Sequence, residues 1–259
     1  ISGNQGITTL EPLRKLSSLN QLFAASTGIT ELMAIKDLFD LEVLDVSNTS
    51  VIDPVPLSRL EKLRDLNLSG TRVVDLSPLK GLSNIRRIGI DQLQARNIEI
   101  LTGLRRLELV YGDGVPGLNQ IVEKLWDSIP GVLVIYQTPE LQKWWASLDE
   151  VWKNTFTQYE PVGPEPDREQ LHRVASIRNL DISRNRGVSG LMPLSVLKRL
   201  EVLNISGVQV SDLLPLGLIT RLQELDCSNT PLTDLSPLTS NRKLKKLNCS
   251  NTPDRKSVV

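Results

Sequence analysis

A phrase of leucines and polar residues recurs every 22 residues, and it constrains the fold more than any other feature of this 259-residue chain. In residues 60–81, leucines stand at 60, 63, 66 and 68, followed by a polar Ser-Gly-Thr corner and an Asp-Leu-Ser-Pro-Leu segment. The same phrase occupies residues 38–59 and returns at 222–238. A fixed period of this length indicates a repeat architecture, in which each unit buries its apolar face only by stacking on its neighbours.

Each repeat predicts one short strand and one short helical turn. The Leu-x-Leu alternation is typical of a strand with one buried face. In the Ser-Pro-Leu segment we expect Ser77 to be the N-cap, Pro78 to take the first helical position and Asp75 to accept free backbone amides. Stacked repeats would lay their strands side by side in a parallel sheet, about 4.8 Å apart.

The middle residue of each expected strand gives the register of the repeats. It falls at Leu22, Leu44, Leu66, Ile88 and Leu107, and then at Leu180, Leu203, Leu225 and Leu247. The spacing is 22 residues except for 19 before Leu107 and 23 before Leu203. Because the coil before Leu107 lacks the Ser-Pro-Leu turn, we expect its outer side to be distorted.

A longer repeat groups the coils into two arrays. Residues 1–13 match residues 182–194, and the same offset of 181 carries Leu22 onto Leu203. We therefore expect a tandem duplication, with a first array at 1–137 that is truncated at its N-terminus. The second array, at 177–259, is expected to be truncated at its C-terminus, and residues 138–176 form a helical cap or linker.

The stretch between the arrays breaks the frame. Residues 115–126 predict a loop leading into a helix, residues 132–136 a last strand, and residues 167–174 a short helix. Residues 139–156 predict one amphipathic helix with an apolar stripe of Leu141, Trp144, Trp145, Leu148, Trp152 and Phe156. All four tryptophans lie between 126 and 152. They form either a hydrophobic cap on the second array or an exposed aromatic binding platform.

The repeats resemble the 22-residue class of leucine-rich repeats found in bacterial internalins and in the regulatory subunit of protein phosphatase 1. The resemblance covers roughly residues 1–110 and 177–252, and the segment 139–156 resembles the capping segment of bacterial leucine-rich-repeat proteins. It implies an α/β solenoid with a concave parallel sheet, two tandem arrays joined by a helical, Trp-rich cap, and a secreted or cell-surface location. It also implies protein or glycan binding on the concave face.

The chain departs from this class at the polar corner, which usually carries a ladder of stacked asparagines. Asn4 and Asn185 keep that residue, whereas threonines replace it at positions 27, 49, 71, 230 and 252. A threonine hydroxyl can still bond to nearby backbone, so we expect a mixed ladder.

Composition and residue types argue against several functions. Thirty basic residues balance thirty acidic ones, so no net charge attracts nucleic acid or an anionic membrane. No apolar run approaches the roughly 18 residues that suggest a membrane span. Cys227 and Cys249 stand at equivalent core positions of successive repeats, where we expect small buried side chains, with a disulfide between adjacent coils as the alternative. The only histidine, His172, lies on the expected short helix before the second array, where we expect a polar surface or capping role rather than catalysis. We expect no enzyme, no cofactor and no metal site.

One group of side chains stands out on the expected sheet face. Four arginines on two neighbouring strands, with acidic residues and a tyrosine beside them, have a composition favoured at protein interfaces. The candidate partner-binding residues are Phe23, Asp65, Arg86, Arg87, Arg105, Arg106, Glu108 and Tyr111. The alternative is a salt-bridged surface in which Asp65 and Glu108 neutralise the arginines.

The sequence therefore predicts a non-catalytic module that binds a protein partner on its concave face. Two alternatives stay open, a carbohydrate- or cell-wall-binding module and a structural spacer in a larger surface protein.

Overall fold

The computed structural model describes residues 1–183 and 185–253, so residues 184 and 254–259 of the expected second array lie outside the description. The chain divides into two compact units, Ile1–Gln137 and Thr138–Val259. Each unit has its own parallel sheet, and the two sheets are separate in the described residues.

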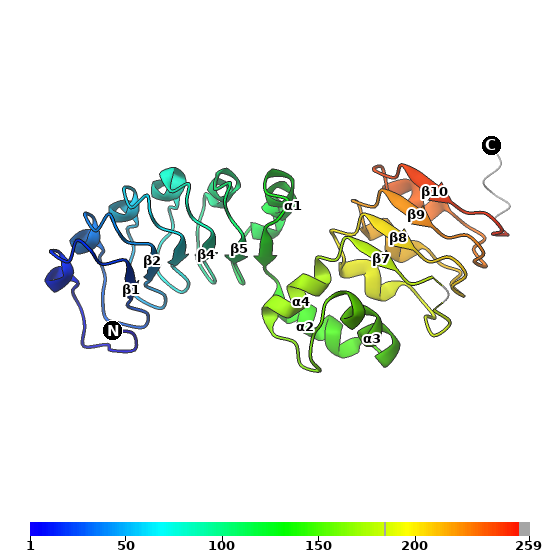
Figure 1. Ribbon diagram of the computed structural model, residues 1–259, viewed down its shortest axis with the longest axis horizontal. Coiled ribbons are helices and arrows are strands. Elements are labelled where there is room, and N and C mark those ends of the chain that lie inside the picture. Colours follow the sequence, from blue (N-terminus) through cyan, green and yellow to red (C-terminus); the bar gives the residue numbers. More distant parts are fainter. Residues whose placement is uncertain (184, 254–259) are drawn as a thin grey trace. The chain divides into compact units, whose positions relative to one another are not determined.

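The first unit is a stack of coils whose strands form a six-stranded parallel sheet in chain order. The strands lie side by side (Figure 1) and are β1 (Gln21–Phe23), β2 (Val43–Asp45), β3 (Asp65–Asn67), β4 (Arg87–Gly89), β5 (Leu109–Tyr111) and β6 (Leu133–Ile135). Leu22, Leu44, Leu66 and Ile88 pair as middle residues, as the repeat predicts. They point into one continuous apolar core.

The predicted register of the fifth strand is wrong. Ile88 pairs with Val110 rather than with Leu107, so the 22-residue spacing continues unbroken. Leu107 is a buried core residue that precedes the strand. The misleading feature is Gly112, which follows the strand where a leucine is expected. A side chain there would collide with Leu118, so the glycine makes room for the helix that follows.

Short 3₁₀ helices return the chain on the outer side of the first unit. They are η1 (Glu11–Leu13), η2 (Met33–Ile35), η3 (Val55–Leu57), η4 (Ser77–Gly81) and η5 (Ile98–Gly103), and α1 (Leu118–Ser128) follows β5. The expected helix after residue 115 and the strand after residue 132 are thus confirmed.

The predicted N-cap of the outer turn is also wrong. Leu76 occupies the cap position, and Ser77 is the first residue of η4. Asp75 does accept the free amide of Ser77, at 2.8 Å, as predicted. The pKa of Asp75 lies below its ordinary value because the hydroxyl and amide of Ser77 and the side chain of Asn97 donate to it.

The corner threonines bond within their own coils. Thr27, Thr49 and Thr71 each donate a hydroxyl hydrogen to the carbonyl three residues earlier, at 2.8, 2.7 and 2.6 Å. Thr230 does the same in the second unit, at 2.6 Å. The threonines therefore close each corner locally, and backbone hydrogen bonds connect one coil with the next.

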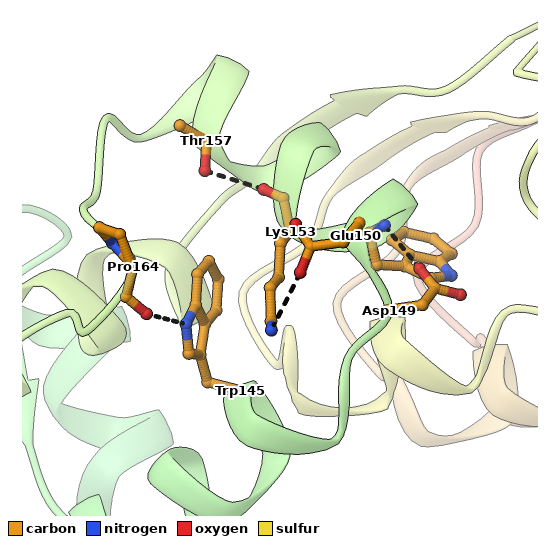
Figure 2. Close-up of polar contacts among 7 residues, drawn as sticks. Trp145, Asp149, Glu150, Lys153, Thr157 and Pro164 are labelled. Carbon is orange, nitrogen blue, oxygen red and sulfur yellow. Dashed lines mark hydrogen bonds and ion pairs between the residues drawn. The ribbon is translucent and has the colours of Figure 1, made fainter.

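The second unit begins with helices α2 (Thr138–Ser147), α3 (Glu150–Tyr159) and α4 (Arg168–Ala175). The single helix predicted over 139–156 is wrong, because Asp149 interrupts it. Asp149 is extended and accepts the amide of Trp152 at 2.9 Å, which makes it the N-cap of α3 (Figure 2). Trp145 at the end of α2 donates its ring nitrogen to the Pro164 carbonyl at 3.4 Å (Figure 2).

The aromatic side chains of these helices belong to the core of the second array. Trp145, Trp152 and Phe156 share one apolar cluster with the strand leucines of that array. Trp152 and Phe156 stack with ring centroids 5.3 Å apart. Trp144 is half-buried and donates to the Pro193 carbonyl at 3.1 Å. These contacts favour the hydrophobic cap over the exposed aromatic platform for three of the tryptophans, whereas Trp126 is buried in the core of the first array.

The second sheet has four parallel strands in chain order. They are β7 (Asn179–Asp181), β8 (Val202–Asn204), β9 (Glu224–Asp226) and β10 (Lys246–Asn248), with outer turns η6 (Met192–Val196), η7 (Leu214–Leu218) and η8 (Ser236–Ser240). Leu180, Leu203, Leu225 and Leu247 pair as predicted. Cys227 is buried and Cys249 half-buried, and both are free thiols. Burial raises the pKa of Cys227 to about 12.

Candidate binding surface

Two rows of side chains cover the outward face of the first sheet. The middle residue of each strand is buried, so the first and third residues face outward. The first row consists of Gln21, Val43, Asp65, Arg87, Leu109 and Leu133. The third row consists of Phe23, Asp45, Asn67 and Tyr111, whereas the third residues of β4 and β6, Gly89 and Ile135, are buried.

The structure places the eight predicted partner-binding residues in three different settings. Asp65 and Arg87 are register partners in the first row, and Phe23, 49% exposed, and the half-buried Tyr111 lie in the third row. Arg86 and Glu108 precede their strands by one residue and pair with each other at 3.0 Å.

Arg105 and Arg106 lie further from the sheet face than predicted. Both belong to the turn before β5, because the register of that strand is shifted by three residues. Arg105 donates to the Ser128 carbonyl, and Arg106 donates to the Asn84 side chain. Leu109 takes the outward position that the sequence assigned to a charged residue. The four arginines therefore do not all lie on two neighbouring strands.

Asp65 and Arg87 carry opposite charges on neighbouring strands and do not pair. No side-chain hydrogen bond or ion pair joins them, or either of them to another group, within residues 1–183 and 185–253. Beside them, Arg64 pairs with Glu42 at 3.6 Å and Arg86 with Glu108 at 3.0 Å. Arg87 is exposed and Asp65 half-buried, so both charges remain open to a partner.

On the equivalent surface of the second sheet, side chains of neighbouring strands form an ion pair and hydrogen bonds with one another. In its first row Glu224 pairs with Lys246 at 2.8 Å. In its third row Asn204 donates to Asp181 at 3.1 Å, and Asn248 donates to Asp226 at 2.9 Å. Side chains of β8, β9 and β10 line a depression of about 250 Å³ on this face.

The third-row carboxylates of the second sheet stay ionised because of their hydrogen bonds. Burial raises the pKa of Asp226, but the hydroxyl and amide of Ser228 and the amide of Asn248 lower it by more. The pKa of Asp181 is likewise lowered: burial opposes the shift, and donors from Ser183 and Asn204 outweigh it. These carboxylates act as acceptors within the scaffold.

The part of the chain that the structure describes also has titratable groups and helices outside the two sheet faces. It contains no group of three His, Cys, Asp or Glu side chains arranged to hold a metal ion. None of its helices has the length and apolar character needed to cross a membrane. His172 is buried, and its Nδ1 lies 2.7 Å from the Arg168 carbonyl oxygen.

Known proteins agree with this geometry at the level of the repeat. Residues 220–256 match the family model described as "Leucine Rich repeats (2 copies)". The coils of strand, corner and 3₁₀ turn elsewhere in the chain keep the same register. The matched residues lie in the second array, and the first array repeats the same 22-residue spacing of strand residues. No curated protein matches the sequence.

Solved structures similar to this chain include two internalins of Listeria monocytogenes. One, inlF, is 21% identical, with 92% of this chain and 62% of that chain covered and a TM-score of 0.44. The other, inlC2, is 19% identical, with 96% and 79% covered and a TM-score of 0.42. A leucine-rich-repeat protein of Leptospira interrogans is 16% identical, with 93% and 57% covered and a TM-score of 0.43.

The chain thus spans less than two thirds of the length of inlF and of the Leptospira protein.

Sequence reasoning missed two residues in the first row of this sheet face, Leu109 and Leu133. The signal for Leu109 was present, because adding 22 to Ile88 gives Val110 as the middle residue of the next strand. Leu133 follows a longer coil that contains α1, so no fixed spacing indicates its position.

Proposed function

We propose that this leucine-rich-repeat protein is a non-catalytic module that binds a protein partner across the outward face of its first sheet. Leucine-rich repeats generally serve as protein–protein interaction modules. Within residues 1–183 and 185–253, Asp65 and Arg87 at the centre of the first row have no side-chain partner, and this observation carries the proposal.

Binding through these two charges requires no existing ion pair to be broken. A charged group that is already paired must lose its partner before it can contact another protein, and that loss offsets the gain. Asp65 and Arg87 avoid this cost, whereas Glu224 and Lys246 in the second sheet do not.

Apolar side chains flank the two charges. Val43 lies on one side in β2, and Leu109 and Leu133 lie on the other in β5 and β6, all half-buried. An apolar contact next to a directional charge is the usual composition of an interface centre. We keep Phe23, Arg86, Arg105, Arg106, Glu108 and Tyr111 as proposed margin residues of this surface.

Quantitative capture from an extract of the native organism tests the proposal. The immobilised wild-type protein is compared with Arg87→Ala and with Lys246→Ala, which alters the equivalent row of the second sheet. We expect Arg87→Ala to reduce capture about fivefold or more, as a central interface residue does, and Lys246→Ala to leave it unchanged.

Equal capture by all three proteins would remove the first row as the binding surface. Specific retention of polysaccharide but of no protein would support the carbohydrate-binding alternative, and retention of neither would support a spacer.

A further inference from the structure

The first row of the first sheet has an ordered chemical pattern across four neighbouring strands. Val43, Asp65, Arg87 and Leu109 follow one another in register on β2, β3, β4 and β5. The row is therefore apolar, acidic, basic and apolar in turn. A partner that crosses these strands meets one side chain per strand.

The distance between neighbouring side chains of the row indicates which secondary structure of a partner fits it. Neighbouring strands lie about 4.8 Å apart, so the row spans about 14 Å from Val43 to Leu109. An extended segment places side chains of one face about 6.7 Å apart, or about 20 Å over three intervals. An α-helix advances about 5.4 Å per turn, or about 16 Å over three turns. The helix therefore differs from the span of the row by about 2 Å, and the extended segment differs from it by about 6 Å. Flexible Lys and Glu side chains can compensate for the smaller difference more easily.

We propose that the first row accepts an α-helix of a partner protein lying across β2 to β5. Successive turns of this helix present an apolar, a basic, an acidic and an apolar side chain. The basic side chain faces Asp65, and the acidic one faces Arg87. This inference rests on the proposed function and adds the chemistry and conformation of the partner.

Charge complementarity determines which two side chains the partner helix presents to Asp65 and Arg87. Asp65 and Arg87 have no side-chain partner within the described residues, so a helix with one basic and one acidic group pairs both at once. A helix with two like charges is attracted by one of these two residues and repelled by the other. The two ends of the row are both apolar but its two charges are opposite, so a helix of given sequence pairs both charges in one direction only.

Three fluorescently labelled helical peptides test the proposal with the whole 259-residue chain. All three share apolar residues on the outer two of four turns and identical solvent-facing residues. The inner two turns carry Lys and Glu, two Glu, or two Lys. Circular dichroism verifies equal helicity, and fluorescence anisotropy at low salt measures the dissociation constants. A fourth peptide carries proline in the middle of the Lys/Glu sequence, which breaks the helix.

We expect the Lys/Glu peptide to bind about tenfold more tightly than either like-charge peptide and the proline peptide to lose binding. The variant Asp65→Lys makes the two central positions both basic, so it should prefer the two-Glu peptide. The variant Arg87→Glu makes both acidic and should prefer the two-Lys peptide. Glu224→Lys, in the second sheet, should leave all preferences unchanged.

Equal binding of the three peptides, or a preference that does not follow the substitutions, would overturn the helix proposal. If that happens while Arg87→Ala still reduces partner capture, the proposed function stands and only its partner chemistry fails. If no peptide binds and Arg87→Ala captures as well as wild type, both proposals fail.

Discussion

The two sheets share a backbone register but differ in how their outward side chains are bonded. In the second sheet, opposite charges in the first row pair, with Glu224 and Lys246 at 2.8 Å. In the first sheet, Asp65 and Arg87 occupy the same kind of neighbouring positions without pairing. The repeat therefore fixes the strands and the core but leaves the outward residues to differ in role.

The third rows show the same contrast. Asn204 bonds to Asp181 and Asn248 bonds to Asp226 across strands of the second sheet. In the first sheet Asp45 and Asn67 are register partners, yet among the described residues the side chain of each accepts one hydrogen bond, from the backbone amide two residues later. Identical residue types thus serve as cross-strand scaffold in one array and remain available for contacts in the other.

The largest predicted effect concerns the helices that cover the second array. Phe156 is fully buried among Trp144, Trp152 and the core of that array, so Phe156→Ala should cost about 3–5 kcal/mol of stability. Hydrogen exchange should accelerate in β7 to β9 but not in β1 to β4. The control is Phe23→Ala, which removes an exposed ring. Equal exchange changes in both sheets would contradict the separate cores.

A smaller effect compares the corners of the two arrays. Thr71 and Thr230 each donate a buried hydroxyl to the carbonyl three residues earlier. Replacing either by valine keeps the shape and removes one hydrogen bond, so each change should cost about 1 kcal/mol. Chemical denaturation should give similar losses for both. A clearly unequal pair of values would show that the arrays differ inside as well as on their faces.

An even smaller loss of stability is expected from a change in the third row of the second sheet. Asn204→Asp removes a donor from Asp181 and places a like charge beside it, so we expect a loss of about 0.5–1 kcal/mol at pH 7. Asn67→Asp, the control, should cost less because no cross-strand bond is lost. Urea denaturation at several pH values measures both.

The pH dependence of that variant has a definite sign. In the wild type the pKa of Asp181 is lowered, so its contribution to stability is present above its unfolded value of 3.8 and is lost as pH falls through the lower folded pKa. In the Asn204→Asp variant, the carboxylates at positions 181 and 204 repel each other, so they protonate more readily. The difference from wild type should therefore shrink as pH falls from 7 toward about 4. A difference that grows on acidification would contradict this.

Much of the fold is predictable because a leucine-rich coil cannot bury its apolar face alone. Nearly all middle residues, from Leu22 to Leu247, follow from the spacing of the leucines. The exception at Leu107 arose because Leu107-Glu108-Leu109 imitates the strand pattern, while Gly112 hides the true one. The break between α2 and α3 was also encoded, since Asp149 is a good N-cap residue inside an apolar stripe.

The candidate surface was less predictable, because side-chain pairing depends on conformations that spacing does not specify. Asp65 and Arg87 were recognised as outward residues, but nothing in the sequence distinguishes them from Glu224 and Lys246, which pair. The arginines at 105 and 106 were misplaced with the register of β5.

The most direct test is a pair of double-mutant cycles that measure the coupling between first-row charges in each sheet. Each cycle combines the single and double alanine variants of Asp65 and Arg87, or of Glu224 and Lys246. The account predicts a coupling energy near zero for Asp65 with Arg87 and about 0.2–1 kcal/mol for Glu224 with Lys246. A coupling for Asp65 and Arg87 as large as that of the second pair would show that these charges are already committed to each other, and would contradict the account.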